Sequence, residues 1–119
     1  MNTYKDLIVW KKSVQLSVAM YKLTEKFPKE ELFGLTSQMR RAAVSIPSNI
    51  AEGKLRGGKK ECRQFFFIAF ASGGELETQI TISRQLVKTK NLDYTEVDKL
   101  LEEVMKMLNT MITKLAPIA

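Results

Sequence analysis

Apolar residues recur at helical spacing in four segments of this 119-residue chain, and this pattern constrains the fold more than any other feature. The spacing predicts helices over residues 4–26, 35–52 and 59–88, and a fourth from Thr95 to about residue 115. No segment has the alternating pattern of a strand. Because long amphipathic helices with short connections form bundles, we predict one all-α domain over residues 1–119, an antiparallel up-down-up-down four-helix bundle.

The second predicted helix carries Pro47 in its middle. An interior proline removes one backbone hydrogen bond and clashes with the preceding turn, at a cost of about 3 kcal/mol. Ser45 and Ser48 flank the proline and can hydrogen-bond the backbone groups that a bend would free. We therefore predict a proline-kinked helix with a structural kink at Ser45, Pro47, Ser48 and Asn49. The alternative is a binding notch lined by the same polar side chains and Glu52.

The first predicted helix has two opposed apolar stripes, which cannot both face the core of one small bundle. One stripe holds Leu7, Trp10, Val14, Val18 and Tyr21. The other faces the opposite side, and we expect it to meet a second copy of the chain. In the third helix, residues 65–71 are apolar all round and need cover on every side. The predicted interface of a homo-oligomer comprises Val9, Leu16, Met20, Leu23, Phe66, Phe67 and Phe70.

The chain is basic, with a formal net charge of +6, and its cations concentrate between residues 40 and 63. Phosphate backbones bind clustered cations through counterion release. The predicted nucleic-acid contacts are Arg40, Arg41, Lys54, Arg56, Lys59, Lys60 and Arg63. The alternative is a solvated loop with structural arginines, in which Arg40 and Arg41 pair with carboxylates such as Glu52, Glu75 or Glu77. We expect no base stacking, because no aromatic residue interleaves with these cations in the sequence.

Several functions are disfavoured by what the sequence lacks. The chain has no histidine, which excludes imidazole catalysis and imidazole metal ligation, and it has no phosphate-binding glycine loop. Cys62 lies among cations near a helix N-terminus, surroundings that lower a thiol pKa, but it has no partner residue. We expect no enzymatic activity, no cofactor and no metal.

The longest apolar run has seven residues, too few to cross a membrane. The single cysteine and the lack of a signal-peptide pattern favour a cytoplasmic protein.

Several motifs resemble those of a known bacterial family. They are Leu7-Ile8-Val9-Trp10-Lys11-Lys12, Phe27-Pro28-Lys29-Glu30-Glu31, Gly34-Leu35, the block from Gln38 to Gly53, and the residues Glu61, Phe65, Ile68-Ala69, Ser72 and Glu75-Leu76-Glu77-Thr78-Gln79. Together they resemble the four-helix-bundle family named for reading frames in intervening sequences of 23S ribosomal RNA. The chain departs from the family pattern at Ala71, where relatives usually have glycine, and at Gly73-Gly74.

The resemblance implies a cytoplasmic bundle that assembles as a homopentamer and has no attached enzymatic activity. The chain is also similar to the accessory variability protein of diversity-generating retroelements, a basic pentamer that binds nucleic acid and partners a reverse transcriptase. The expected partners are therefore other copies of the chain, RNA or DNA, and a nucleic-acid enzyme, but no membrane. The alternative function is a protein-interaction scaffold without nucleic-acid contact.

Overall fold

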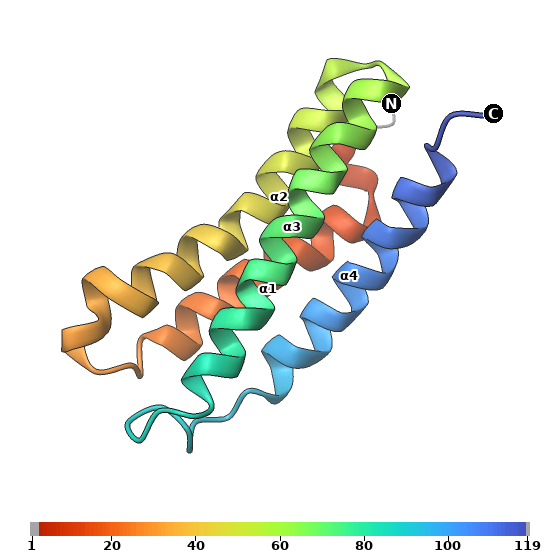
Figure 1. Cartoon of the computed structure of the whole chain (residues 1–119). Coiled ribbons are helices and arrows are strands. Elements are labelled where there is room, and N and C mark those ends of the chain that lie inside the picture. The colour runs from red at the N-terminus through yellow and green to blue at the C-terminus, as the bar shows by residue number, and fades with distance from the viewer. Residues whose placement is uncertain (1–2, 119) are drawn as a thin grey trace.

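The computed structural model describes residues 3–118 and consists of four packed α-helices without any strand in that range (Figure 1). The helices are α1 (Ile8–Thr24), α2 (Ser37–Arg56), α3 (Lys59–Ser83) and α4 (Thr95–Lys114). A 3-10 turn (Tyr4–Asp6) precedes α1. A second 3-10 turn (Lys29–Glu31) and a π-helical turn (Leu32–Thr36) join α1 to α2. The predicted all-α four-helix bundle is confirmed.

Each helix packs against two neighbours around one shared core. The packed pairs are α1 with α2, α2 with α3, α3 with α4, and α4 with α1. Figure 1 shows the α1–α2 and α3–α4 connections at one end of the bundle, and the α2–α3 connection at the other end together with both chain termini. Residues near the two termini therefore lie at the same end as the α2–α3 loop, which matters for the candidate site.

Apolar residues at helical spacing in α2 and α4 form much of the core. In α2, Met39, Ala42, Ala43, Ile46 and Ile50 are buried. In α4, the buried side chains are Val97, Leu100, Leu101, Val104, Leu108 and Ile112. The apolar spacing of these two helices therefore corresponds to their inward faces.

For α1 the predicted interface stripe is wrong, because it faces the core of the single chain. Val9, Leu16, Met20 and Leu23 are at most 7% exposed and are not available to a second copy. Ser13 and Ser17 lie on the same buried face, with their hydroxyls bonded to the carbonyls of Trp10 and Ser13. These small serines line the inward face of α1. In the opposite stripe, Val18 and Tyr21 are exposed, whereas Leu7 and Trp10 are half-buried against the core.

The phenylalanine run of α3 divides between core and surface. Phe66 is fully buried in the core, so its predicted place in an interface between copies is also wrong. Phe70 is half-buried against the core. Phe67 and its neighbour Ile68 remain nearly half exposed in the single chain.

Helix α2 runs through Pro47 without interruption, and a kink there stays a prediction. The hydroxyls of Ser45 and Ser72 are 2.9 Å apart and hydrogen-bonded, and the Asn49 amide donates to the carbonyl and hydroxyl oxygens of Ser45. Ser48 donates to the carbonyl of Val44. The Ser45–Ser72 bond ties α2 to α3, whereas the bonds of Ser48 and Asn49 lie within α2.

The carbonyl that Pro47 leaves without its helical partner belongs to Ala43, four residues earlier. The Ser17 hydroxyl of α1 lies 3.1 Å from that oxygen and 3.0 Å from the carbonyl of Ser13. The Ser13 carbonyl lies inside α1, where the helical ladder supplies a backbone donor. Ser17 therefore supplies the donor that the proline removes, across the α1–α2 interface.

We expect Ser17→Ala to lower the free energy of unfolding by about 1–3 kcal/mol, the cost of leaving a buried carbonyl unpaired. In a Pro47→Ala background the restored N–H of residue 47 can bond the Ala43 carbonyl, so Ser17→Ala should cost much less there. Urea unfolding of the four proteins in this double-mutant cycle measures the difference. Equal costs in both backgrounds would contradict this role for Ser17.

Gly57, rather than Gly53, ends α2. Gly57 has φ of +84°, the left-handed conformation typical of a residue that follows a helix. Gly53 lies inside the helix, where a Cβ would be 3.1 Å from the Cys62 carbonyl oxygen and from the Phe65 Cβ. Gly53 therefore allows α2 and α3 to approach closely beside the loop that joins them.

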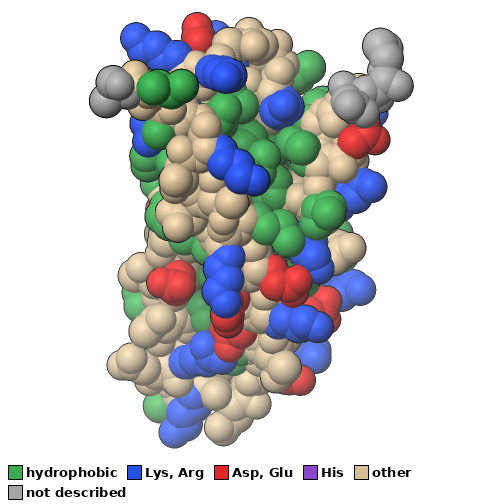
Figure 2. Space-filling model, turned by 90° about the vertical axis from the view of Figure 1, so that its right-hand side faces the viewer, with side chains coloured by type: hydrophobic (Ala, Val, Ile, Leu, Met, Phe, Trp, Pro, Cys, Tyr) green, Lys and Arg blue, Asp and Glu red, His purple; other side chains and the backbone are tan. Residues whose placement is uncertain are grey.

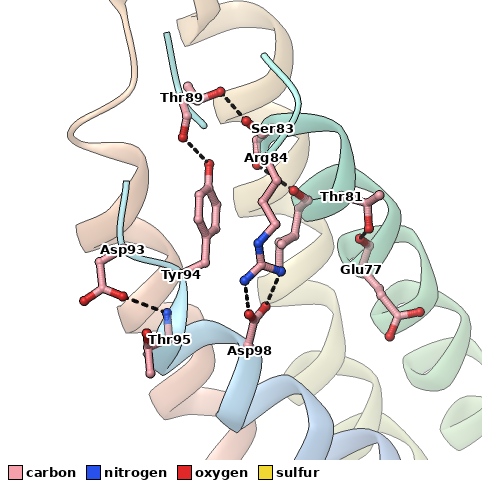
Figure 3. Close-up of polar contacts among 10 residues, drawn as sticks. Glu77, Thr81, Ser83, Arg84, Thr89, Asp93, Tyr94, Thr95 and Asp98 are labelled. Carbon is pink, nitrogen blue, oxygen red and sulfur yellow. Dashed lines mark hydrogen bonds and ion pairs between the residues drawn. The ribbon is translucent and has the colours of Figure 1, made fainter. Parts of the chain in front are cut away.

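The α3–α4 connection is held by hydrogen bonds that replace the last predicted turn of α3 (Figure 3). The buried Thr89 hydroxyl donates to the Ser83 carbonyl (2.6 Å), and the Tyr94 hydroxyl donates to the Thr89 carbonyl (2.9 Å). Arg84 lies over the Tyr94 ring and forms an ion pair with Asp98. At the start of α4 the Asp93 carboxylate accepts the backbone N–H of Thr95.

Candidate nucleic-acid interface

Four of the predicted cations surround the α2–α3 loop, and all four are exposed. Lys54 and Arg56 lie in the last turn of α2, and Lys59 and Lys60 in the first turn of α3. The start of α3 has no side-chain cap, so its backbone N–H groups add positive potential to that of the two lysines. The N-terminus of a helix carries a partial positive charge, which repels lysines placed there. The combined positive potential of the helix end and the lysines favours an anion bound at this point.

The structure brings two further lysines to this end of the bundle. Lys5 lies beside Lys54, since both line the same shallow pocket. Lys114 ends α4, two residues after Ile112, whose carbonyl accepts a hydrogen bond from the Arg63 Nε (3.0 Å). We call the resulting surface the basic end, and it comprises Lys5, Lys54, Arg56, Lys59, Lys60, Arg63 and Lys114. Figure 2 shows Lys and Arg side chains at the top of the molecule, the end where both termini lie.

Few carboxylates neutralise the basic end. Arg56 pairs with Glu52 one turn earlier in α2, with Nε 2.8 Å from the carboxylate oxygen. Within residues 3–118, Lys54, Lys59 and Lys60 form no ion pair. Their ammonium groups are therefore free to bind phosphates.

Arg40 and Arg41 do not belong to the basic end. Arg41 precedes Lys54 by 13 residues in α2, which corresponds to roughly 20 Å along the helix. The Arg40 Nε donates to the Thr24 hydroxyl (2.9 Å), and its guanidinium lies 4.5 Å from the centre of the Tyr21 ring. Arg40 thus ties α2 to α1, whereas Arg41 is exposed. Within the described protomer neither pairs with Glu52, Glu75 or Glu77.

Aromatic side chains do accompany the cations, contrary to the sequence-based expectation. The Arg56 guanidinium lies 5.2 Å from the centre of the Phe65 ring, and that of Arg63 lies 4.9 Å from the centre of the Phe67 ring. Arg63 and Phe67 are four residues apart and so share one face of α3. This spacing was the signal in the sequence that could have revealed the contact.

Cys62 is buried, and the pKa of its thiol is raised, whereas its cationic neighbours in the sequence predict a lowered pKa. Burial raises the pKa of the thiol above its ordinary value, and the nearby charge of Lys54 lowers it by a smaller amount. A buried thiol with a raised pKa is a weak nucleophile at neutral pH.

Residues 3–118 hold no group of three or more Cys, Asp or Glu side chains placed to bind a metal ion. None of the helices in that range combines the length and apolar character that a membrane crossing requires.

These features define a class of protein: a small helical bundle with a mainly cationic end and an otherwise mixed surface. The model of the 23S rRNA-intervening sequence protein family matches residues 5–110, and the chain belongs to that family. Comparison with curated proteins gave no match.

Proposed function

We propose that the protein is a non-enzymatic, homo-oligomeric bundle that binds RNA or DNA through its basic end, as an accessory to a nucleic-acid enzyme in the cytoplasm. The observation that carries this proposal is the convergence of cations from three separate parts of the chain on one end of the bundle. Three of these, Lys54, Lys59 and Lys60, have no ion-pair partner in residues 3–118. The cysteine content, a single buried thiol, is consistent with a reducing compartment.

Exposed apolar side chains support the homo-oligomeric part of the proposal. Phe33 is 93% exposed, and Val18, Tyr21 and Val44 are between 41% and 50% exposed on α1 and α2. Phe33, Tyr21 and Val44 line one shallow groove together with Arg40 and Arg41. A second copy that covers this groove would remove the apolar surface from water, and a ring of copies, a homopentamer in this proposal, would repeat the basic end once per subunit. Repetition strengthens binding to a long polyanion through avidity.

The basic end can be tested by removing four of its charges. We expect the variant with Lys5, Lys54, Lys59 and Lys60 changed to Gln to bind a fluorescently labelled RNA at least ten-fold more weakly than wild type in 50 mM salt. For every phosphate that the variant no longer neutralises, the slope of log affinity against log salt should also fall by about 0.7–0.9. Fluorescence anisotropy titrations at several salt concentrations measure both quantities.

A matched control removes four exposed lysines at or near the opposite end of the bundle. In this variant Lys22, Lys26, Lys29 and Lys90 are changed to Gln. This control has the same net charge as the test variant and should keep most of the wild-type affinity. Equal weakening in both variants would mean that only net charge matters and would contradict a defined site. No binding by wild type at low salt would reject the nucleic-acid proposal and favour a protein-interaction scaffold.

A further inference from the structure

A cleft of about 720 Å³ opens beside the basic end, between residues 59–67 of α3 and the segment that follows α4. Its residues from α3 include Lys59, Lys60, Arg63 and Phe67, and those from the C-terminal segment include Leu115 and Pro117. The volume lies within the range of about 300–1,000 Å³ that is usual for small-molecule sites. On the face shown in Figure 2, exposed hydrophobic side chains lie below the Lys and Arg side chains of the upper end.

The cleft combines two kinds of wall. Lys59 and Lys60 are exposed cations, while Phe67, Leu115 and Pro117 supply an apolar wall. Phe67 is 46% exposed, so part of its ring is available for contact. Arg63 is fixed between these walls, since its Nε donates to the Ile112 carbonyl and its guanidinium lies against the Phe67 ring.

This combination of cations and an apolar wall fits an unstacked nucleotide better than it fits a phosphate alone or a purely apolar ligand. A phosphate alone would leave the apolar wall exposed to water, and a purely apolar ligand would leave the lysines without a counter-charge. A nucleotide in a single strand offers a phosphate and, a few ångströms away, a flat base that can stack on an aromatic ring. In a duplex the bases are already paired and stacked, and extruding one costs a few kcal/mol.

We propose, building on the nucleic-acid function above, that the basic end prefers single strands and accepts one unstacked base in this cleft. Lys59 and Lys60 bind the flanking phosphates, and the base packs against Phe67 and the Leu115–Pro117 segment. Arg63 holds the Phe67 ring and adds a cation close to the base. The site reads no particular sequence through this contact, because every base has a face that can stack.

The test compares Phe67→Ala with wild type on two probes, an unstructured 12-nucleotide oligouridine and a 12-base-pair RNA duplex. We expect wild type to prefer the single strand. We expect Phe67→Ala to weaken single-strand binding by about 5- to 150-fold, the equivalent of about 1–3 kcal/mol for one stacked base, and to leave duplex binding unchanged. Phe67→Tyr keeps an aromatic ring and should retain the wild-type preference.

Two controls keep the result interpretable. Circular dichroism and sedimentation of Phe67→Ala should match wild type, whereas a change in mass would place Phe67 in a contact between copies and overturn the inference. An oligonucleotide of the same length that consists of abasic sites should bind wild type as weakly as oligouridine binds Phe67→Ala. If wild type binds both probes equally, or Phe67→Ala weakens neither, only the base-cleft inference fails. If wild type binds neither probe, the nucleic-acid function itself fails.

Discussion

Leu16→Glu is expected to leave the chain unfolded at 25 °C. Leu16 is completely buried in the core between α1 and its neighbours, so the variant loses the burial of a leucine and must also desolvate a carboxylate that has no partner. The first effect costs about 2–5 kcal/mol and the second several more, which together approach the whole stability of a small domain, about 5–15 kcal/mol. Far-UV circular dichroism and a thermal melt measure the outcome.

Val18→Glu is the matched control, because Val18 lies two residues away in α1 but is 50% exposed. It places the same charge on the same helix and should keep the helical signal and a cooperative melt. A folded Leu16→Glu protein that merely changes its oligomeric state would contradict the core that we describe and restore the interface predicted for this stripe.

Val44→Glu is expected to dissociate the proposed homo-oligomer without unfolding the chain. Val44 is 41% exposed on α2 and shares its groove with Phe33 and Tyr21. Because every contact between copies would carry the change, each would replace apolar contact with a buried carboxylate. Its desolvation costs several kcal/mol, and pairing with Arg40 or Arg41 of the same groove would offset only part of that cost. We expect sedimentation to give wild type as an oligomer and Val44→Glu as a single chain of 13.6 kDa.

Val87→Glu is the control for that experiment. Val87 is 81% exposed in the α3–α4 connection and does not line the groove of Val44. The same charge there should leave the mass unchanged. A wild-type mass of 13.6 kDa at micromolar concentration would contradict the homo-oligomeric proposal, and an unchanged mass of Val44→Glu would show that another face forms the contact.

The fold was predictable because local pattern and global packing agree in α2 and α4. In α1 they do not, since the buried face contains Ser13 and Ser17, whose polarity conceals their role as small core residues. Hydroxyls that bond to nearby carbonyls can be buried at little cost, and that compensation is invisible in a pattern of apolar spacing. Which of two apolar stripes faces inward depends on the neighbouring helices, and therefore on contacts distant in the sequence.

The candidate site was predictable only where its residues are consecutive in the chain. The cluster from Lys54 to Arg63 follows from the loop between two helices, but Lys5 and Lys114 join it only because both termini lie at that end of the bundle. Arg40 and Arg41 are close to the cluster in the sequence, but they lie far from it along the rigid helix α2. Phe67 is nearly half exposed, so its predicted place in a contact between copies stays a prediction, and its contact with Arg63 follows from their spacing of four residues in α3.

Ultraviolet cross-linking of wild type to bound oligouridine, followed by mass spectrometry of the peptides, tests the basic end most directly. We expect cross-linked peptides from residues 54–67 and from the C-terminal segment around Leu115, with Phe67 among the modified positions. Cross-links that fall instead on residues 22–29 or 88–90, at the opposite end of the bundle, would contradict a nucleic-acid site at the basic end.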